Sequence, residues 1–127
     1  MSNALIGELD ITVNEKSYTL RPTFEGLIEI EKRANCSLAQ LTNRILLGIA
    51  GITDVTAIIY GGIYGHSEGK PPITHGDIGQ QIMKHGYCNL LGECGQFVAA
   101  SISGTDINEC AKTEVKKNED QTPTTLK

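Results

Sequence analysis

The chain has 127 residues and a formal net charge of −4, and its Lys and Arg residues form no basic stripe, so we do not expect nucleic acid as a partner. No apolar stretch approaches the ~20 residues needed to span a bilayer, and the N-terminus lacks a secretory signal pattern, which predicts a cytoplasmic protein without membrane contact. Its four cysteines are too few and too irregularly spaced for a disulfide framework, so we expect free thiols.

Residues 7–23 have the pattern of a β-hairpin. Apolar and polar side chains alternate on both sides of a turn at residues 14–16, which is the period of a strand with one buried face. The side chains of that face are Leu9, Ile11, Val13, Tyr18 and Leu20. A lone two-stranded ribbon is only marginally stable in water, so we expect this face to lie on helices.

A short amphipathic helix is predicted directly after the hairpin, over residues 24–34. Thr23 can cap its first turn, and Asn35 ends it. Its expected buried stripe consists of Leu27, Ile30 and Ala34.

The second helix has the clearest start signal in the chain. Ser37 and Gln40 form a capping box, in which each side chain can satisfy a free backbone donor of the other residue. Gly48 and Gly51 weaken the helix near its end. We expect its apolar face to consist of Leu38, Leu41, Ile45 and Ile49.

Thr53 opens a third helix with the most regular amphipathic spacing in the sequence. The residues of its apolar stripe are Val55, Ile58, Ile59, Gly62 and Ile63. The glycine-rich residues 61–65 follow no strand and lack a Gly-Lys-Ser/Thr signature, so they indicate close helix packing and not a phosphate site. Residues 65–72, with two consecutive prolines, predict a loop.

The longest helix is expected from Thr74, as a cap, to about Ser101. Its seam consists of Met83, Tyr87, Leu90, Cys94, Phe97 and Ser101. Three glycines within it cost helix propensity, which indicates a close approach of another element.

The sequence thus predicts an α+β, mainly α fold, with an N-terminal hairpin packed on about four helices. Residues 1–104 form one domain. Residues 105–127 are polar and have no apolar period, so we expect a largely disordered tail.

Candidate chemistry is sparse. His85 and Cys88 lie three residues apart, and Cys94 follows, which allows the hypothesis of a small metal-binding or enzymatic domain. Cys94 is rotated roughly 120° from Cys88 on a helix of 3.6 residues per turn, so buried free thiols are the simpler interpretation. His66 and His75 flank the glycine-proline loop and are expected to be solvated. We predict no catalytic residue, metal or cofactor.

The order of the elements resembles the tail assembly chaperone family of gene transfer agents and siphophages across residues 7–104. The segments that carry the resemblance are the hairpin ending at residues 18–22, the helix at 24–31, the cap at 37–41, the helix opened at 53–55 and the glycine-bearing helix to about 104. The resemblance implies a small non-enzymatic protein made in the infected or producing bacterial cell and absent from the finished particle. It implies two partners: the tape measure protein, which the chaperone would keep soluble, and tail tube subunits. Self-association into a homo-oligomer stays open.

A chaperone of this kind needs an apolar surface that exchanges partners. We expect it on the third helix, where Tyr60 and Tyr64 lie beside Ile59 and Ile63 and next to the 65–72 loop. The alternative interpretation is that both tyrosines cover the core. A second alternative is a structural tail component retained in the particle, which would show more β-structure than one hairpin and would self-associate into rings.

Overall fold

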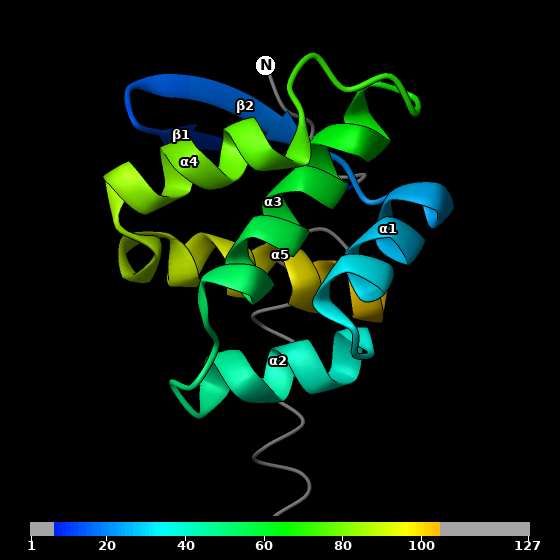
Figure 1. The fold of residues 1–127 in the computed structure, drawn as a ribbon. Helices are drawn as coiled ribbons and strands as arrows, with labels where there is room; N and C mark the ends of the chain where they lie inside the picture. Colours follow the sequence, from blue (N-terminus) through cyan, green and yellow to red (C-terminus); the bar gives the residue numbers. More distant parts are fainter. Residues whose placement is uncertain (1–6, 105–127) are drawn as a thin grey trace, which may run out of the picture.

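A computed structural model describes residues 7–104, which form a two-stranded hairpin and helices gathered around one central helix (Figure 1). The elements are β1 (Leu9–Val13), β2 (Lys16–Leu20), α1 (Phe24–Ala34), α2 (Leu38–Leu46), α3 (Ile52–His66), α4 (His75–His85), the 3₁₀ turn η2 (Tyr87–Leu90) and α5 (Leu91–Ser103). The predicted α+β, mainly α fold with an N-terminal hairpin is therefore confirmed.

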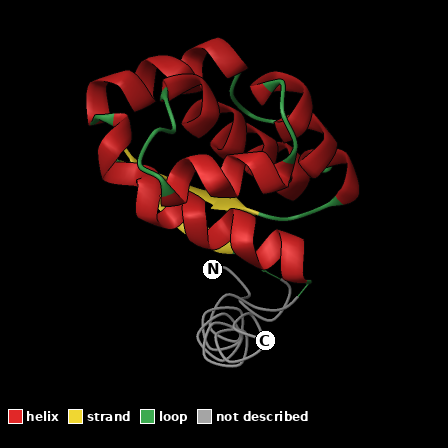
Figure 2. Cartoon of the chain, turned by 90° about the horizontal axis from the view of Figure 1, so that it is seen from below, coloured by secondary structure: helices red, strands yellow, loops and turns green. Residues whose placement is uncertain are grey.

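The hairpin is antiparallel, with Leu9 opposite Leu20 and Ile11 opposite Tyr18. Its turn is one residue shorter than predicted, because Asn14 and Glu15 alone make it, with φ values of 50° and 71°. Positive φ at both central residues is the requirement of the two-residue turn that matches the twist of paired strands. The apolar face lies against the helices, as the alternation predicted (Figure 2).

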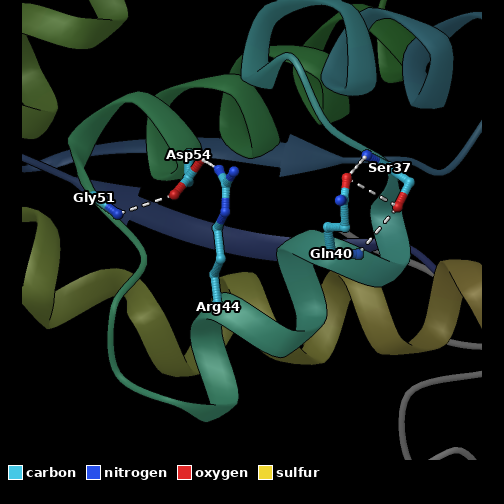
Figure 3. Close-up of polar contacts among 5 residues, drawn as sticks. All are labelled: Ser37, Gln40, Arg44, Gly51 and Asp54. Carbon is cyan, nitrogen blue, oxygen red and sulfur yellow. Dashed lines mark hydrogen bonds and ion pairs between the residues drawn. The ribbon is translucent and has the colours of Figure 1, made fainter.

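The predicted helix caps are present. The Thr23 hydroxyl accepts a hydrogen bond of 3.1 Å from the Gly26 backbone N–H, and Asn35 ends α1 in the left-handed conformation. The Ser37 hydroxyl accepts from the Gln40 backbone N–H at 3.1 Å, and the Gln40 side chain accepts from the Ser37 backbone N–H at 2.9 Å (Figure 3). These signals could be predicted because they depend on residues only three apart.

The junction between α2 and α3 differs from the prediction. Helix α2 ends at Leu46, and Ile49 is exposed, so its assignment to the buried apolar face was wrong. Helix α3 begins one residue before Thr53, and the first turn is capped by Asp54, whose carboxylate accepts from the Gly51 backbone N–H at 3.0 Å. Gly48, at φ 73°, turns the chain out of the helical path before Ile49.

Helix α3 is central and is not amphipathic in the way its spacing suggested. Its residues from Asp54 to Ile63 are buried, since α1, β2, α4 and α5 all pack against it (Figure 1). A helix that is apolar or small on every side is a core helix. It also extends two residues into the predicted 65–72 loop, so the observed loop begins at Ser67.

Glycines on α3 allow the backbone of α1 and the end of β2 to approach it closely. A Cβ atom at Gly61 would collide with the Ile30 side chain, and a Cβ at Gly26 of α1 would lie 2.7 Å from the Gly61 carbonyl oxygen. A Cβ at Gly62 would lie 2.6 Å from Cβ of Leu20, at the end of β2. The predicted close-packing role of the glycine-rich segment is therefore confirmed.

The predicted long helix over residues 74–101 is broken at Gly86. Its φ of 93° and ψ of 105° lie outside the helical region, and α4, η2 and α5 replace the single helix. Leu90, Cys94 and Phe97 of the predicted seam are buried, but Met83 is exposed. The seam therefore describes η2 and α5, and it fails in α4.

The hairpin turn meets the end of α4 at this break. The backbone N–H of Asn14 donates a hydrogen bond of 3.0 Å to Nδ1 of His85.

The predicted disordered tail, residues 105–127, lies outside the described residues. Between residues 7 and 104 no helix is both long enough and apolar enough to cross a membrane.

The glycine contact predicts a large difference between two glycine-to-alanine changes. Gly61→Ala should lower the free energy of unfolding by about 2 kcal/mol, because overpacking in a tight contact costs roughly 1–3 kcal/mol. Gly92→Ala, where a Cβ would meet nothing within 4 Å, should leave stability unchanged or raise it by up to about 1 kcal/mol. Urea titration followed by circular dichroism measures both. Equal stability of the Gly61→Ala variant and the wild type would contradict the close approach.

Candidate functional site

The four residues predicted as a partner surface lie at different depths. Ile59 and Ile63 are buried in the core, and Tyr60 is only 8% exposed. Tyr64 is half-buried and is the member of the set that reaches the surface. A partner role for this set stays a prediction, and in this conformation Tyr64 is the residue that could fulfil it.

Tyr60 lies at the meeting point of α1, α3 and α4. The Arg33 guanidinium carbon lies 4.8 Å from the centroid of its ring, and the His75 ring meets it edge-on at 5.5 Å between centroids. Nε of Arg33 also donates to the Glu29 carboxylate at 2.8 Å, which holds the guanidinium in place. Contacts of this kind contribute roughly 0.5–2 kcal/mol each, so Tyr60 is a structural anchor of the three helices.

The electrostatic environment of His75 follows from this cluster. Burial lowers its pKa from the ordinary value of 6.5, and the positive charge of Arg33 lowers it further, while Glu29 acts in the opposite direction. The neutral imidazole is therefore favoured in the folded protein.

Tyr64 borders a partly enclosed cavity of about 450 Å³ between the end of β2, the start of α1 and the end of α3. The turn after α3 supports the cavity wall, since the Gly69 backbone N–H donates to the Tyr64 carbonyl at 2.9 Å. The lining residues are Arg21, Thr23, Glu25, Tyr64, Gly65, Glu68 and Gly69.

The cavity is lined by polar and charged groups and one aromatic ring. Its groups are one guanidinium, two carboxylates, a phenol and a hydroxyl that already accepts a hydrogen bond from the α1 backbone. No histidine or cysteine is among its lining residues. Such a lining can bind a polar or aromatic side chain of a partner.

The hypothesis of a metal site around His85 and Cys88 finds no cluster in the structure. Nδ1 of His85 already accepts from Asn14, and Cys88 is exposed on η2. Between residues 7 and 104 there is no group of three or more His, Cys, Asp or Glu side chains placed to hold a metal ion.

The thiols differ in environment. Cys94 is buried in α5, and burial raises its pKa to about 12. Burial also raises the pKa of Cys36, which is half-buried, although Arg44 opposes this shift. Cys36, Cys88 and Cys94 are free, in agreement with the expectation for the part of the chain that the structure describes.

Sequence reasoning missed the largest group of exposed apolar side chains. They follow the end of α2, where residues 45–52 read Ile-Leu-Leu-Gly-Ile-Ala-Gly-Ile without a charged side chain. An uncharged apolar run interrupted by two glycines could have indicated an exposed turn, because glycines weaken a helix and favour turns. Phe24 and Ile28 on α1 are exposed as well.

A family model described as "Phage tail tube protein, GTA-gp10" matches residues 6–80. The matched segment covers the hairpin, α1 to α3 and the first half of α4, and it ends before η2 and α5. Comparisons with curated proteins and with solved structures gave no match.

The lowered pKa of His75 predicts a pH dependence of stability. Below pH 6.5 the unfolded chain takes up a proton at this histidine more readily than the folded protein, so His75 should lower the free energy of unfolding as the pH falls from 6.5 through its folded pKa. The His75→Gln variant should lose less stability than the wild type between pH 7.5 and 5. Parallel stability curves for the two proteins in urea titrations would show that His75 does not contribute.

The thiols should react in the order of their exposure to solvent, with the most exposed thiol reacting first. In a Cys110→Ser background, Ellman's reagent should label Cys88 rapidly and Cys36 more slowly, because only the thiolate reacts. Cys94 should react only after denaturant is added, and Cys88→Ser should remove the fast phase. Rapid labelling of Cys94 in the native protein would contradict its burial.

Proposed function

The chain belongs to the gene transfer agent and phage tail family whose model matches more than half of it, and from this we propose that it is a non-enzymatic tail assembly chaperone. In this proposal it acts in the cytoplasm of the bacterial host or producing cell. It binds the tape measure protein, keeps it soluble and aids the assembly of tail tube subunits around it.

The observation that carries the proposal is the small share of sheet in the fold. The described residues contain one sheet of two strands, and its apolar face is covered by the protein's own helices. A tube wall made by joining sheets between subunits needs more strand than this. A domain with helices on its outside suits contact with a long helical client, since helix faces pack on one another.

The proposed contact surface includes Tyr64 and the cavity that it borders. Phe24 lies between two residues that line this cavity, and it is 75% exposed. A tyrosine at the edge of a cavity and an exposed phenylalanine are frequent anchors of protein interfaces, because they bury a large area at a small entropic cost.

A structural tail component is the second candidate, and the description of the family as a tail tube protein favours it. It predicts that the chain remains in the finished particle and forms rings. The chaperone proposal predicts that the chain is absent from the particle.

The test is co-expression with the cognate tape measure protein, followed by affinity purification. The wild type should keep the tape measure protein soluble and co-purify with it. Tyr64→Ala should weaken this recovery at least severalfold, because it removes the aromatic side chain at the cavity. Tyr87→Ala, which changes another half-buried tyrosine, is the matched control and should retain it.

Mass spectrometry of purified particles completes the comparison. Two results together would overturn the chaperone function: tape measure protein that stays insoluble, and this chain in stoichiometric amounts in the particle. The structural tail component would then be the function. Circular dichroism melting of both tyrosine variants separates a lost contact from a lost fold.

A further inference from the structure

The connection between α2 and α3 presents aliphatic side chains that the core does not cover. We call it the apolar turn and define it by four residues. They are Leu46, Leu47, Ile49 and Ile52, which are 77%, 69%, 66% and 39% exposed. Single exposed apolar residues are ordinary, but four within seven residues of a small domain form a patch of the type that marks interaction sites.

The apolar turn is held by its own hydrogen bonds. Gly48 N–H donates to the Ile45 carbonyl at 3.1 Å and Ile49 N–H donates to the Arg44 carbonyl at 2.9 Å, with Gly48 at φ 73°. This is the pattern of a Schellman motif, in which the two residues after a helix close its last carbonyls. In such motifs the second of these residues commonly packs back on the helix, yet Ile49 is directed largely to solvent.

A partly buried ion pair fixes the turn between its two helices. Nη1 of Arg44 on α2 donates to Oδ1 of Asp54 on α3 at 2.8 Å, and Oδ2 of the same carboxylate accepts from the Gly51 N–H at 3.0 Å (Figure 3). The Asp54 side chain is buried and the Arg44 side chain is 38% exposed, so this clamp is partly shielded from water. The apolar side chains are therefore presented on a preorganised support, which lowers the entropic cost of binding.

The charge around the turn restricts its occupant. Residues 45–53 contain no charged side chain, and the charged residues on either side, Arg44 and Asp54, pair with each other. An occupant with a charge at the centre of the contact would lose hydration without gaining a partner, which is unfavourable. The turn therefore selects an uncharged, apolar segment.

The area of the apolar turn favours a client protein over a second copy of the chain as the occupant. A patch of this kind falls in the range of roughly 300–600 Å² that the largest patch of a monomer reaches. A stable dimer buries about 800 Å² on each partner, so the turn alone is too small for a permanent pair. It suits a partner that binds and is later released.

We propose that the apolar turn is a docking site for an uncharged stripe of aliphatic side chains on a helix of the client. This proposal rests on the proposed chaperone function and adds a second contact to it. The turn precedes α3, whereas Tyr64 lies in the last turn of that helix, so the two contacts are separated along α3 by roughly 18 Å at 1.5 Å per residue.

The test uses the full chain co-expressed with its tape measure protein. Leu47→Gln combined with Ile49→Gln should reduce recovery of the client at least tenfold, because it places two amide side chains in the apolar contact. Met83→Gln combined with Ile102→Gln, which changes two exposed apolar residues on α4 and α5, is the matched control and should leave recovery within about twofold of the wild type. Thermal melting should show both double variants folded, since all four side chains are exposed.

The outcomes distinguish the two proposals. If the wild type retains the client and the Leu47→Gln/Ile49→Gln variant retains it equally, the docking site is wrong and the chaperone function stands. If the wild type retains no client, both are overturned. A wild-type dimer in sedimentation velocity that this variant converts to monomers would identify a second copy as the occupant and overturn the client assignment.

Discussion

The approach of α1 and β2 to the glycine face of α3 is the constraint on which the arrangement of the other elements depends. Gly61 and Gly62 leave room for the Ile30 and Leu20 side chains, respectively, so two neighbours lie directly on the α3 backbone. The Arg21 backbone N–H can then donate to the Gly62 carbonyl at 3.0 Å, which ties the end of the hairpin to the central helix. With both neighbours this close, α3 is enclosed and its aliphatic side chains become the core.

The predictions that succeeded depend on residues that are close together in the sequence, and those that failed depend on contacts between distant elements. The caps at Thr23, Ser37 and Thr74 and the alternation of the hairpin depend on neighbours within a few residues, and all of them could be recognised in the sequence. The burial of Tyr60 depends on Arg33 and His75, which come from two other helices. The break at Gly86 was missed because the apolar spacing continues across it, although the backbone does not.

The two proposed contacts have different origins, and this affects how well each could be predicted. Tyr64 was recognised as a candidate from its residue type and its place before a glycine-rich loop. The exposure of Leu47 and Ile49 depends on where α2 stops, and helix ends are less certain in a sequence than helix interiors. The Arg44–Asp54 pair that supports the turn joins residues ten apart, outside the range of local capping patterns.

The family match ends before the elements that complete the core. The match ends at residue 80, yet Leu90, Phe97 and Val98 are fully buried members of the same core as α3. In this chain the core around α3 is therefore completed by side chains that lie beyond the matched segment. Without η2 and α5, the apolar side chains of α3 that these elements cover would be open to water.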